Sequence, residues 1–154
     1  MSLLSRLCCA AAAVAGLSAA VPAYAFLGGA YASVAADRAH MAARLRTTAA
    51  ATHTLHTLTL ANGGLVREFS RADGAVFAVT WRGPGRPDLR QLLGDKFAVL
   101  QADNAPRPGR VRRLPPTVNR PDFVVLTGGH PGAFWGVAFL PRNAPPGFSP
   151  SELR

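Results

Sequence analysis

The sequence predicts an α+β fold: an antiparallel sheet of about five strands, one main helix packed on a face of the sheet, and an N-terminal helix near its edge. Three short runs, residues 53–60, 65–70 and 75–81, are dense in β-branched, aromatic and leucine residues, and the turn sequences ANGG and RADG separate them. Residues 88–100 instead repeat apolar residues at the spacing of one helical face. A small β-sandwich is the alternative architecture.

The first 25 residues have the pattern of a secretory signal peptide. A single basic residue, Arg6, precedes an apolar stretch from Leu7 to about Ala20, and the small-x-small triplet Ala23-Tyr24-Ala25 follows. A membrane-spanning helix would need about 20 apolar residues, and Pro22 closes this run. We therefore expect a Sec-type signal peptide cleaved after Ala25, a periplasmic or secreted protein, and no transmembrane segment once it is removed.

Cysteine and charge narrow the chemistry further. Both cysteines, Cys8 and Cys9, lie in the segment that we expect to be removed, which excludes disulfides, thiolate zinc sites and cysteine nucleophiles from the mature chain. The chain is basic, with 17 Lys and Arg against 8 Asp and Glu, and nearly all of its basic residues are arginine. Such a balance favours anionic partners, although arginine-biased base composition and solubility explain it equally simply.

Residues 26–50 are predicted to be an N-terminal helical segment. From Tyr31 to Arg46 the chain is rich in alanine, and Tyr31, Val34, Met41 and Leu45 fall on one helical face. Arg38 interrupts this apolar stripe, which places the helix on the surface of the domain. The following TTAAAT is interpreted as a connector.

Residues 51–141 are predicted to be a single α+β domain. The run 75–81 should be its central strand, covered on both faces, because Phe77, Val79 and Trp81 point one way and Val76, Ala78 and Thr80 the other. Arg67 and Glu68 are then expected on a more exposed neighbouring strand.

The main helix is expected to begin at Asp88. Gln91 lies three residues further on, the spacing of a capping box. The apolar face consists of Leu89, Leu92, Leu93, Phe97 and Leu100. Gly94 lies off this face and indicates either a close backbone approach or a distortion of the helix.

Residues 102–121 are predicted to be an arginine- and proline-rich connector inside the domain, and residues 142–154 an extended C-terminal tail. The default interpretation of the connector is a solvated linker, because exposed arginines keep extended segments soluble. Its arginines are also the best anion-binding candidates of the chain: Arg107, Arg110, Arg112, Arg113 and Arg120. Aromatic residues are not interleaved with them, so nucleic acid is an unlikely partner.

The stretch LTGGHPGAFWGVAFL contains the most conspicuous single residue, His130. Gly128, Gly129, Gly132 and Pro131 suit a hairpin between the last two strands, 122–127 and 134–140, so a structural or partner-contacting role explains the motif. Catalysis by His130 would need a nucleophile or an orienting carboxylate. The sequence contains no serine-glycine elbow or acidic motif that would indicate either group. His130 is thus a weak catalytic candidate.

The remaining aromatic and imidazole candidates are Trp81, Trp135, His40, His53 and His56. Trp81 and Trp135 are expected at the core or its rim and are candidates for ligand contact. His53 and His56 cannot chelate one ion from the same strand, because residues three apart face opposite sides, and they are expected to point outward or to cap the edge of the sheet. Acidic residues occur singly, so the paired carboxylates of a glycosidase are not indicated. No metal site and no cofactor are predicted.

The segments described above resemble a bacterial family of exported proteins, the domain of unknown function 2844. The resemblance rests on LGG at 27–29 with Asp37 beyond it, VREF at 66–69, G-x-V-F-A-V-x-W at 74–81, PDLRQLLG-x-x-F at 87–97, and DFVV-x-x-GGH followed by F-x-G-x-A-F-L-P over 122–141. It is poorest in the connector. It implies an exported single domain without an assigned activity, and it supplies no catalytic residues.

Three functional hypotheses follow. The first is a non-enzymatic envelope or secreted protein that binds a partner through the GGH hairpin, the neighbouring aromatic residues or the basic connector. The second is a small hydrolase that uses His130. The third is an adaptor that holds anionic glycans or lipopolysaccharide with the connector arginines. The identity of the partner and the oligomeric state are not indicated by the sequence.

Overall fold

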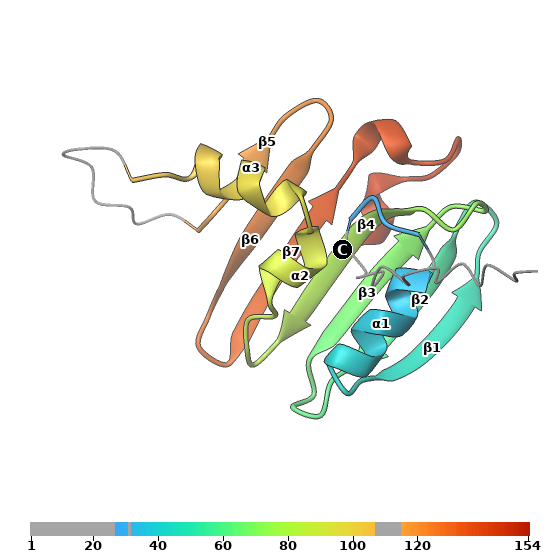
Figure 1. The fold of residues 1–154 in the computed structure, drawn as a ribbon, viewed down its shortest axis with the longest axis horizontal. Helices are drawn as coiled ribbons and strands as arrows, with labels where there is room; N and C mark the ends of the chain where they lie inside the picture. The colour runs from blue at the N-terminus through green and yellow to red at the C-terminus, as the bar shows by residue number, and fades with distance from the viewer. Residues whose placement is uncertain (1–26, 31, 107–114) are drawn as a thin grey trace, which may run out of the picture.

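The computed structural model describes residues 27–30, 32–106 and 115–154. They form one antiparallel sheet in the order β1-β2-β3-β4-β7-β6-β5, with helices on one face (Figure 1). The elements in chain order are α1 (Ala32–His40), β1 (Arg44–Ala49), β2 (Thr54–Thr59), β3 (Leu65–Ser70), β4 (Val76–Gly83), α2 (Leu89–Leu93), α3 (Lys96–Asp103), β5 (Val118–Asn119), β6 (Val124–His130), β7 (Ala133–Phe139), η1 (Pro141–Asn143) and η2 (Pro150–Leu153).

The α+β class is confirmed, but the sheet has seven strands where about five were predicted. The helix expected from Tyr31 to Arg46 ends at His40, because the chain turns at Ala42, with a φ of 46°, and continues as β1. Pairing with β2 along all six residues of β1 overrides the helical pattern of this stretch. The other additional strand, β5, is a two-residue pairing inside the expected connector.

The three α-helices lie on the same face of the sheet (Figure 1). Val34 of α1, Leu92 and Leu93 of α2, and Leu100 of α3 pack with the inward residues of β2, β3, β4, β6 and β7 in one buried cluster. Residues 27–29 run between these layers. The Leu27 amide donates to the Leu92 carbonyl at 3.0 Å, and the amide of Gly28 donates to the Val76 carbonyl at 2.8 Å. The LGG segment thereby ties α2 to the start of the central strand.

The helix predicted from Asp88 to Leu100 is divided in two. The Asp88 carboxylate accepts from the amides of Arg90 and Gln91 and caps α2, as expected, but the Gln91 side chain donates to Asp37, so the reciprocal half of the expected capping box is absent. At Gly94 the backbone takes a φ of 51°, α2 ends, and α3 starts in a new direction. The expected distortion at Gly94 is therefore a helix break.

The opposite face carries an aromatic cluster covered by the C-terminal segment. Phe69, Phe77, Phe139 and Phe148 pack edge to face or tilted, with ring centroids 4.8–6.4 Å apart, around Leu153. The prediction that Phe77 shares a face with Val79 and Trp81 is wrong. The pairing of β3 with β4 shifts between Phe69 and Ser70, and one extra residue reverses the alternation.

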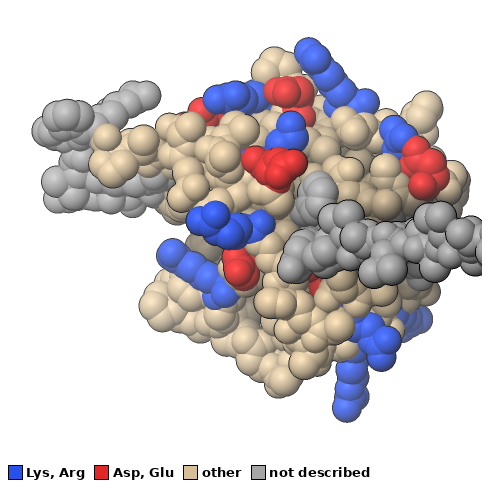
Figure 2. Space-filling model, in the orientation of Figure 1, with Lys and Arg blue, Asp and Glu red and all other residues tan. Residues whose placement is uncertain are grey.

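The C-terminal residues were predicted to be extended, and they instead form η1 and η2. Ser149 caps η2 in a capping box with Glu152, which directs Leu153 into the aromatic cluster, where it is 5% exposed. No helix among the described residues is long and apolar enough to cross a membrane. On the helix-bearing face, basic and acidic side chains are interspersed (Figure 2).

Two carboxyl groups lie in the interior, between α1 and the sheet. Asp37 and Glu68 are 0% and 1% exposed, so the prediction of an exposed Glu68 is wrong. The Gln91 amide donates to Asp37 Oδ1, whereas Asp37 Oδ2 and both Glu68 oxygens have no hydrogen-bond partner among the described residues. Burial raises the pKa of Asp37 to about 6, and burial together with the Asp37 charge raises the pKa of Glu68 to about 9. At neutral pH the pair therefore holds one proton.

This pair makes stability depend on pH in an unusual direction. Each folded-state pKa lies above its unfolded value, so the native state binds more protons and stability falls as pH rises from about 4.5 to about 9. The loss approaches about 1.4 kcal/mol per pH unit for one proton. In Glu68→Gln, urea unfolding between pH 6 and 9 should lose most of this slope, because the amide does not titrate. Asp122→Asn, an exposed change, should keep the slope, and a wild-type stability that rises over this interval would refute the assignment.

Candidate binding groove

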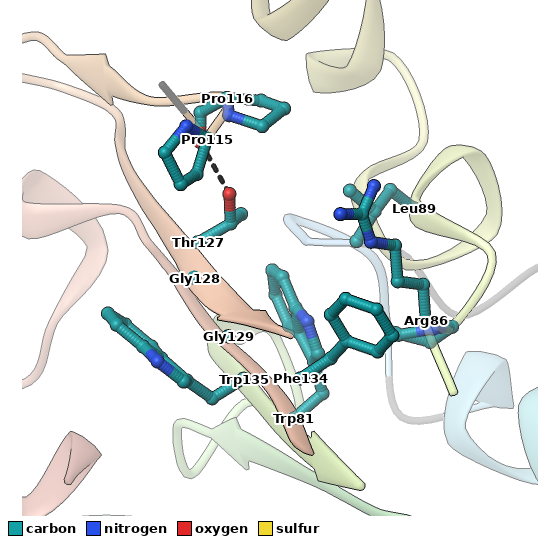
Figure 3. Close-up of a pocket in the computed structure, with 11 residues that line it drawn as sticks. Trp81, Arg86, Leu89, Pro115, Pro116, Thr127, Gly128, Gly129, Phe134 and Trp135 are labelled. Atoms are coloured by element: carbon teal, nitrogen blue, oxygen red, sulfur yellow. Dashed lines mark hydrogen bonds between the residues drawn. The ribbon is translucent and has the colours of Figure 1, made fainter. Parts of the chain in front are cut away.

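A groove of about 330 Å³ opens between the β4–α2 loop and the β6–β7 hairpin, on the helix-bearing side of the sheet (Figure 3). Its lining is mainly aromatic, proline and glycine: Trp81, Arg86, Pro87, Leu89, Pro115, Pro116, Thr127, Gly128, Gly129, Phe134 and Trp135. The size lies in the range of sites that hold small ligands or a short peptide segment. Three parts of the chain that are distant in sequence meet here.

The floor of the groove is the Trp81 indole. Trp81 lies opposite Gly136 in the β4–β7 pairing and is 5% exposed. A Cβ atom on Gly136 would overlap the six-membered ring of this indole. The absent side chain of Gly136 therefore lets the indole lie flat on β7, which explains the glycine inside FWGVAFL.

One wall combines a cation with an aromatic ring. Arg86 follows the end of β4, and its guanidinium lies 4.6 Å from the centroid of the Phe134 ring. Figure 3 shows the Arg86 side chain rising beside Phe134 toward Leu89. A guanidinium stacked on an aromatic face keeps outward N–H donors available for an anionic or carbonyl partner.

The other wall is built by prolines that interrupt the sheet. Pro115 and Pro116 precede β5, and the Thr127 hydroxyl donates to the Pro116 carbonyl at 2.8 Å. Because proline has no amide hydrogen, it cannot continue the ladder that joins Val118 and Asn119 to β6. Among the described residues, Gly128, Gly129 and His130 consequently lack a paired strand on this side of β6.

His130 lies outside the groove, at the exposed tip of the β6–β7 hairpin. Its Nδ1 is hydrogen-bonded to the Pro131 carbonyl at 2.9 Å, and the part of the chain that the structure describes places no carboxylate or serine hydroxyl in contact with the imidazole. Asp122, the acidic residue nearest to His130 in the sequence, lies near the opposite end of β6. The geometry of a general base next to a nucleophile is not present at this residue.

The other predicted site residues divide between the two faces. Trp81 is in the groove, whereas the Trp135 indole points to the other side of the sheet (Figure 3), where it lies over Gly128 and is 47% exposed. The anion-binding candidates of the connector lie outside the described residues: Arg107, Arg110, Arg112 and Arg113. Arg120 is described and forms an ion pair with Asp103 at 2.6 Å.

Of the remaining histidines, His40 is exposed, whereas His53 and His56 are buried, contrary to the outward or edge-capping position predicted for them. They lie on opposite faces, as their spacing requires: His53 is packed against the rings of Phe69 and Phe148, and His56 is 0% exposed among β1, β2 and β3. His56 Nε2 is hydrogen-bonded to Ser70 Oγ at 2.9 Å, and its Nδ1 to the Thr47 hydroxyl at 3.1 Å. Burial lowers the pKa of His56.

The Ser70–His56 contact has the spacing of a nucleophile and its base, and both residues border a hollow of about 320 Å³, but almost none of their surface is exposed. Ser70 is 2% exposed. The group hydrogen-bonded to the other ring nitrogen of His56 is the Thr47 hydroxyl, whereas a catalytic triad has a carboxylate at that position. We therefore interpret it as a polar network that joins three strands. No cluster of three or more His, Cys, Asp or Glu able to hold a metal ion occurs among the described residues.

Several groove residues could not be found from the sequence. Arg86, Phe134 and the Pro115-Pro116 pair belong to segments that the prediction treated as a turn, a strand and a connector. Signals were present nonetheless, because each tryptophan has a glycine opposite it in a neighbouring strand: Gly136 for Trp81 and Gly128 for Trp135. A large aromatic residue beside a strand glycine indicates a close packing site.

Of the comparisons with known proteins, the one with protein-family models gives a match. The model of a family described as "Protein of unknown function (DUF2844)" matches residues 23–153. No curated protein and no solved structure matches the chain.

The Trp81–Gly136 contact predicts a steep cost for one added methyl group. Gly136→Ala should lower the free energy of unfolding by about 1–3 kcal/mol, because the indole must move out of its rotamer and away from the strand. Gly85→Ala is the matched control, since its Cβ meets only Asn62 Nδ2 at an ordinary 3.5 Å, and it should change stability by less than about 0.5 kcal/mol. Equal stability of the two variants in urea unfolding would show that the contact between Trp81 and Gly136 does not constrain this position.

Proposed function

Because the chain belongs to the DUF2844 family, whose description assigns no activity, we propose its function from the groove itself: an exported, non-enzymatic protein that binds an extended peptide segment of a partner protein. The observation that carries this proposal is the composition of the groove lining. The location outside the cytoplasm rests on the signal-peptide pattern of residues 1–25, which lie outside the described part of the chain.

The lining favours binding over catalysis. Its only polar side chains besides the indoles are Arg86 and Thr127, and the hydroxyl of Thr127 is already donated to a carbonyl. Among the described residues of the groove there is no carboxylate, imidazole or other group that exchanges a proton near neutral pH. Aromatic and proline surfaces can bury apolar groups there without such chemistry.

An extended peptide fits these surfaces better than a compact ligand. Gly128 and Gly129 have no side chains of their own, and among the described residues no strand pairs with the edge of β6 at these positions, so their backbone can pair with a peptide backbone. The Trp81 and Phe134 rings and the facing prolines provide places for apolar or proline side chains of the peptide. Arg86 selects an acidic residue or a free carboxylate next to them.

The hydrolase hypothesis receives no support from the surroundings of His130, and the adaptor hypothesis in its original form depends on arginines outside the described residues. Neither hypothesis is supported by an arrangement of side chains among the described residues. A peptide-binding groove uses the aromatic residues beside the hairpin, which the sequence had already singled out.

A selection from a random-peptide library displayed on phage tests the proposal. The purified mature protein should select peptides that combine proline or large apolar residues with an acidic residue. Synthetic copies should bind at least tenfold more weakly to Phe134→Ala and to Arg86→Gln, because these changes remove the two halves of one wall.

Leu126→Ala is the matched control, since Leu126 is 47% exposed and does not line the groove. Its affinity should equal that of the wild type. Peptides that bind all three variants equally would show that the groove is not the binding site, and a selection without enriched sequences would reject peptide binding.

A further inference from the structure

The opposite face of the sheet carries a second hollow, of about 290 Å³, next to the C-terminal segment. It is lined by side chains from β3, β4, β7 and η2, with the main apolar surface supplied by Leu65, Val137 and Leu153. None of the residues of the peptide groove faces it except the two tryptophans, which border both hollows from opposite sides of the sheet.

Three arginines surround this hollow: Arg67, Arg82 and Arg154. Arg67 donates through Nε to the Thr80 hydroxyl at 3.1 Å and through one terminal nitrogen to the main-chain oxygen of Arg154 at 2.9 Å. A guanidinium has five N–H donors, so further donors of Arg67 stay available. These contacts hold the guanidinium of Arg67 in a defined place.

Within the described residues, no Asp or Glu side chain forms an ion pair with any of the three. Elsewhere the exposed arginines of the described chain include pairs with acids, as in Arg120–Asp103 and Arg71–Asp73. Burial, and to a lesser extent the positive charge of Arg82, lower the pKa of Arg67. The two cations thus repel each other, and an anion placed between them would relieve that repulsion.

An aromatic platform lies beside the arginines. Trp135 is directly opposite Arg82 in the β4–β7 pairing, and its indole lies flat over Gly128, where a Cβ would come within 2.7 Å of the ring. Nearly half of the Trp135 surface is exposed. A fixed, exposed indole next to unpaired guanidinium groups is suited to a ligand that has both a flat apolar face and an oxyanion.

We propose that this hollow, with Trp135, Arg82 and Arg67, is a binding site for an acidic sugar: a pyranose ring that stacks on the indole and bears a carboxylate held by the guanidinium groups. Arginine matches a carboxylate in a bidentate geometry. The hollow accommodates about one ring and contains one platform, whereas single-stranded nucleic acid is bound on successive aromatic residues along a groove. A sugar acid is therefore the better occupant.

Titration calorimetry with an oligogalacturonate tests this site. The wild type should bind the acid form and bind its methyl ester at least tenfold more weakly, because esterification removes the charge and keeps the rings. Arg82→Gln and Trp135→Ala should each weaken binding of the acid at least tenfold, and Trp135→Phe should restore most of the loss. Arg82 is exposed, so thermal unfolding of Arg82→Gln should be unchanged, and Trp135→Phe keeps an aromatic ring packed over Gly128.

Arg46→Gln is the matched control. It removes the same charge from an exposed position on β1, at the far edge of the sheet, and should bind as the wild type does. Equal losses in Arg46→Gln and Arg82→Gln, or equal binding of acid and ester, would reduce the site to non-specific attraction and overturn the proposal. Tighter binding of oligo-dT with the same dependence on Arg82 and Trp135 would replace the sugar by nucleic acid, and absence of any binding would also refute it.

Discussion

The packing of the Trp81 indole on Gly136 is the contact on which both faces of the sheet depend. It holds β4 and β7 together at the centre of the sheet and sets the depth of the groove on the helix-bearing side. The same two strands carry Arg82 and Trp135 on the other side. Because successive residues of a strand face opposite sides, one pair of strands can present two different binding surfaces, one mainly apolar and one cationic.

The helical layer is joined to the sheet by two buried carboxyl groups, an arrangement that costs desolvation free energy. Asp37 and Glu68 are both buried and interact electrostatically, and protonation of Glu68 at neutral pH keeps a second negative charge out of the interior. Gln91 adds α2 to this contact. A buried polar cluster of this kind contributes less to stability than apolar packing would, but it fixes which residues of α1 and β3 meet. We infer that it sets the position of α1 on the sheet.

Local sequence patterns predicted where most of the helices and strands occur, but not which residues the tertiary packing buries. The runs around ANGG and RADG and the helix cap at Asp88 were found because turns and caps are encoded within a few residues. The sequence pattern of β3 does not predict the burial of Glu68, because α1 covers that residue. The pattern of β4 does not predict which face Phe77 occupies, because one bulge reverses the alternation. Trp81, Trp135 and the hairpin glycines stand out in the sequence, but the residues that form the walls of the groove come from separate segments.

The central claim is that a partner peptide enters the groove over Trp81 and not the opposite face. The chain has two tryptophans, so an isotopically labelled sample should give two indole N–H resonances, one of which is assigned by its loss in Trp135→Phe. Addition of a selected peptide should shift the Trp81 resonance more than that of Trp135, whose indole lies on the other side of the sheet. A shift of Trp135 alone, or of neither indole on saturation with peptide, would contradict the account.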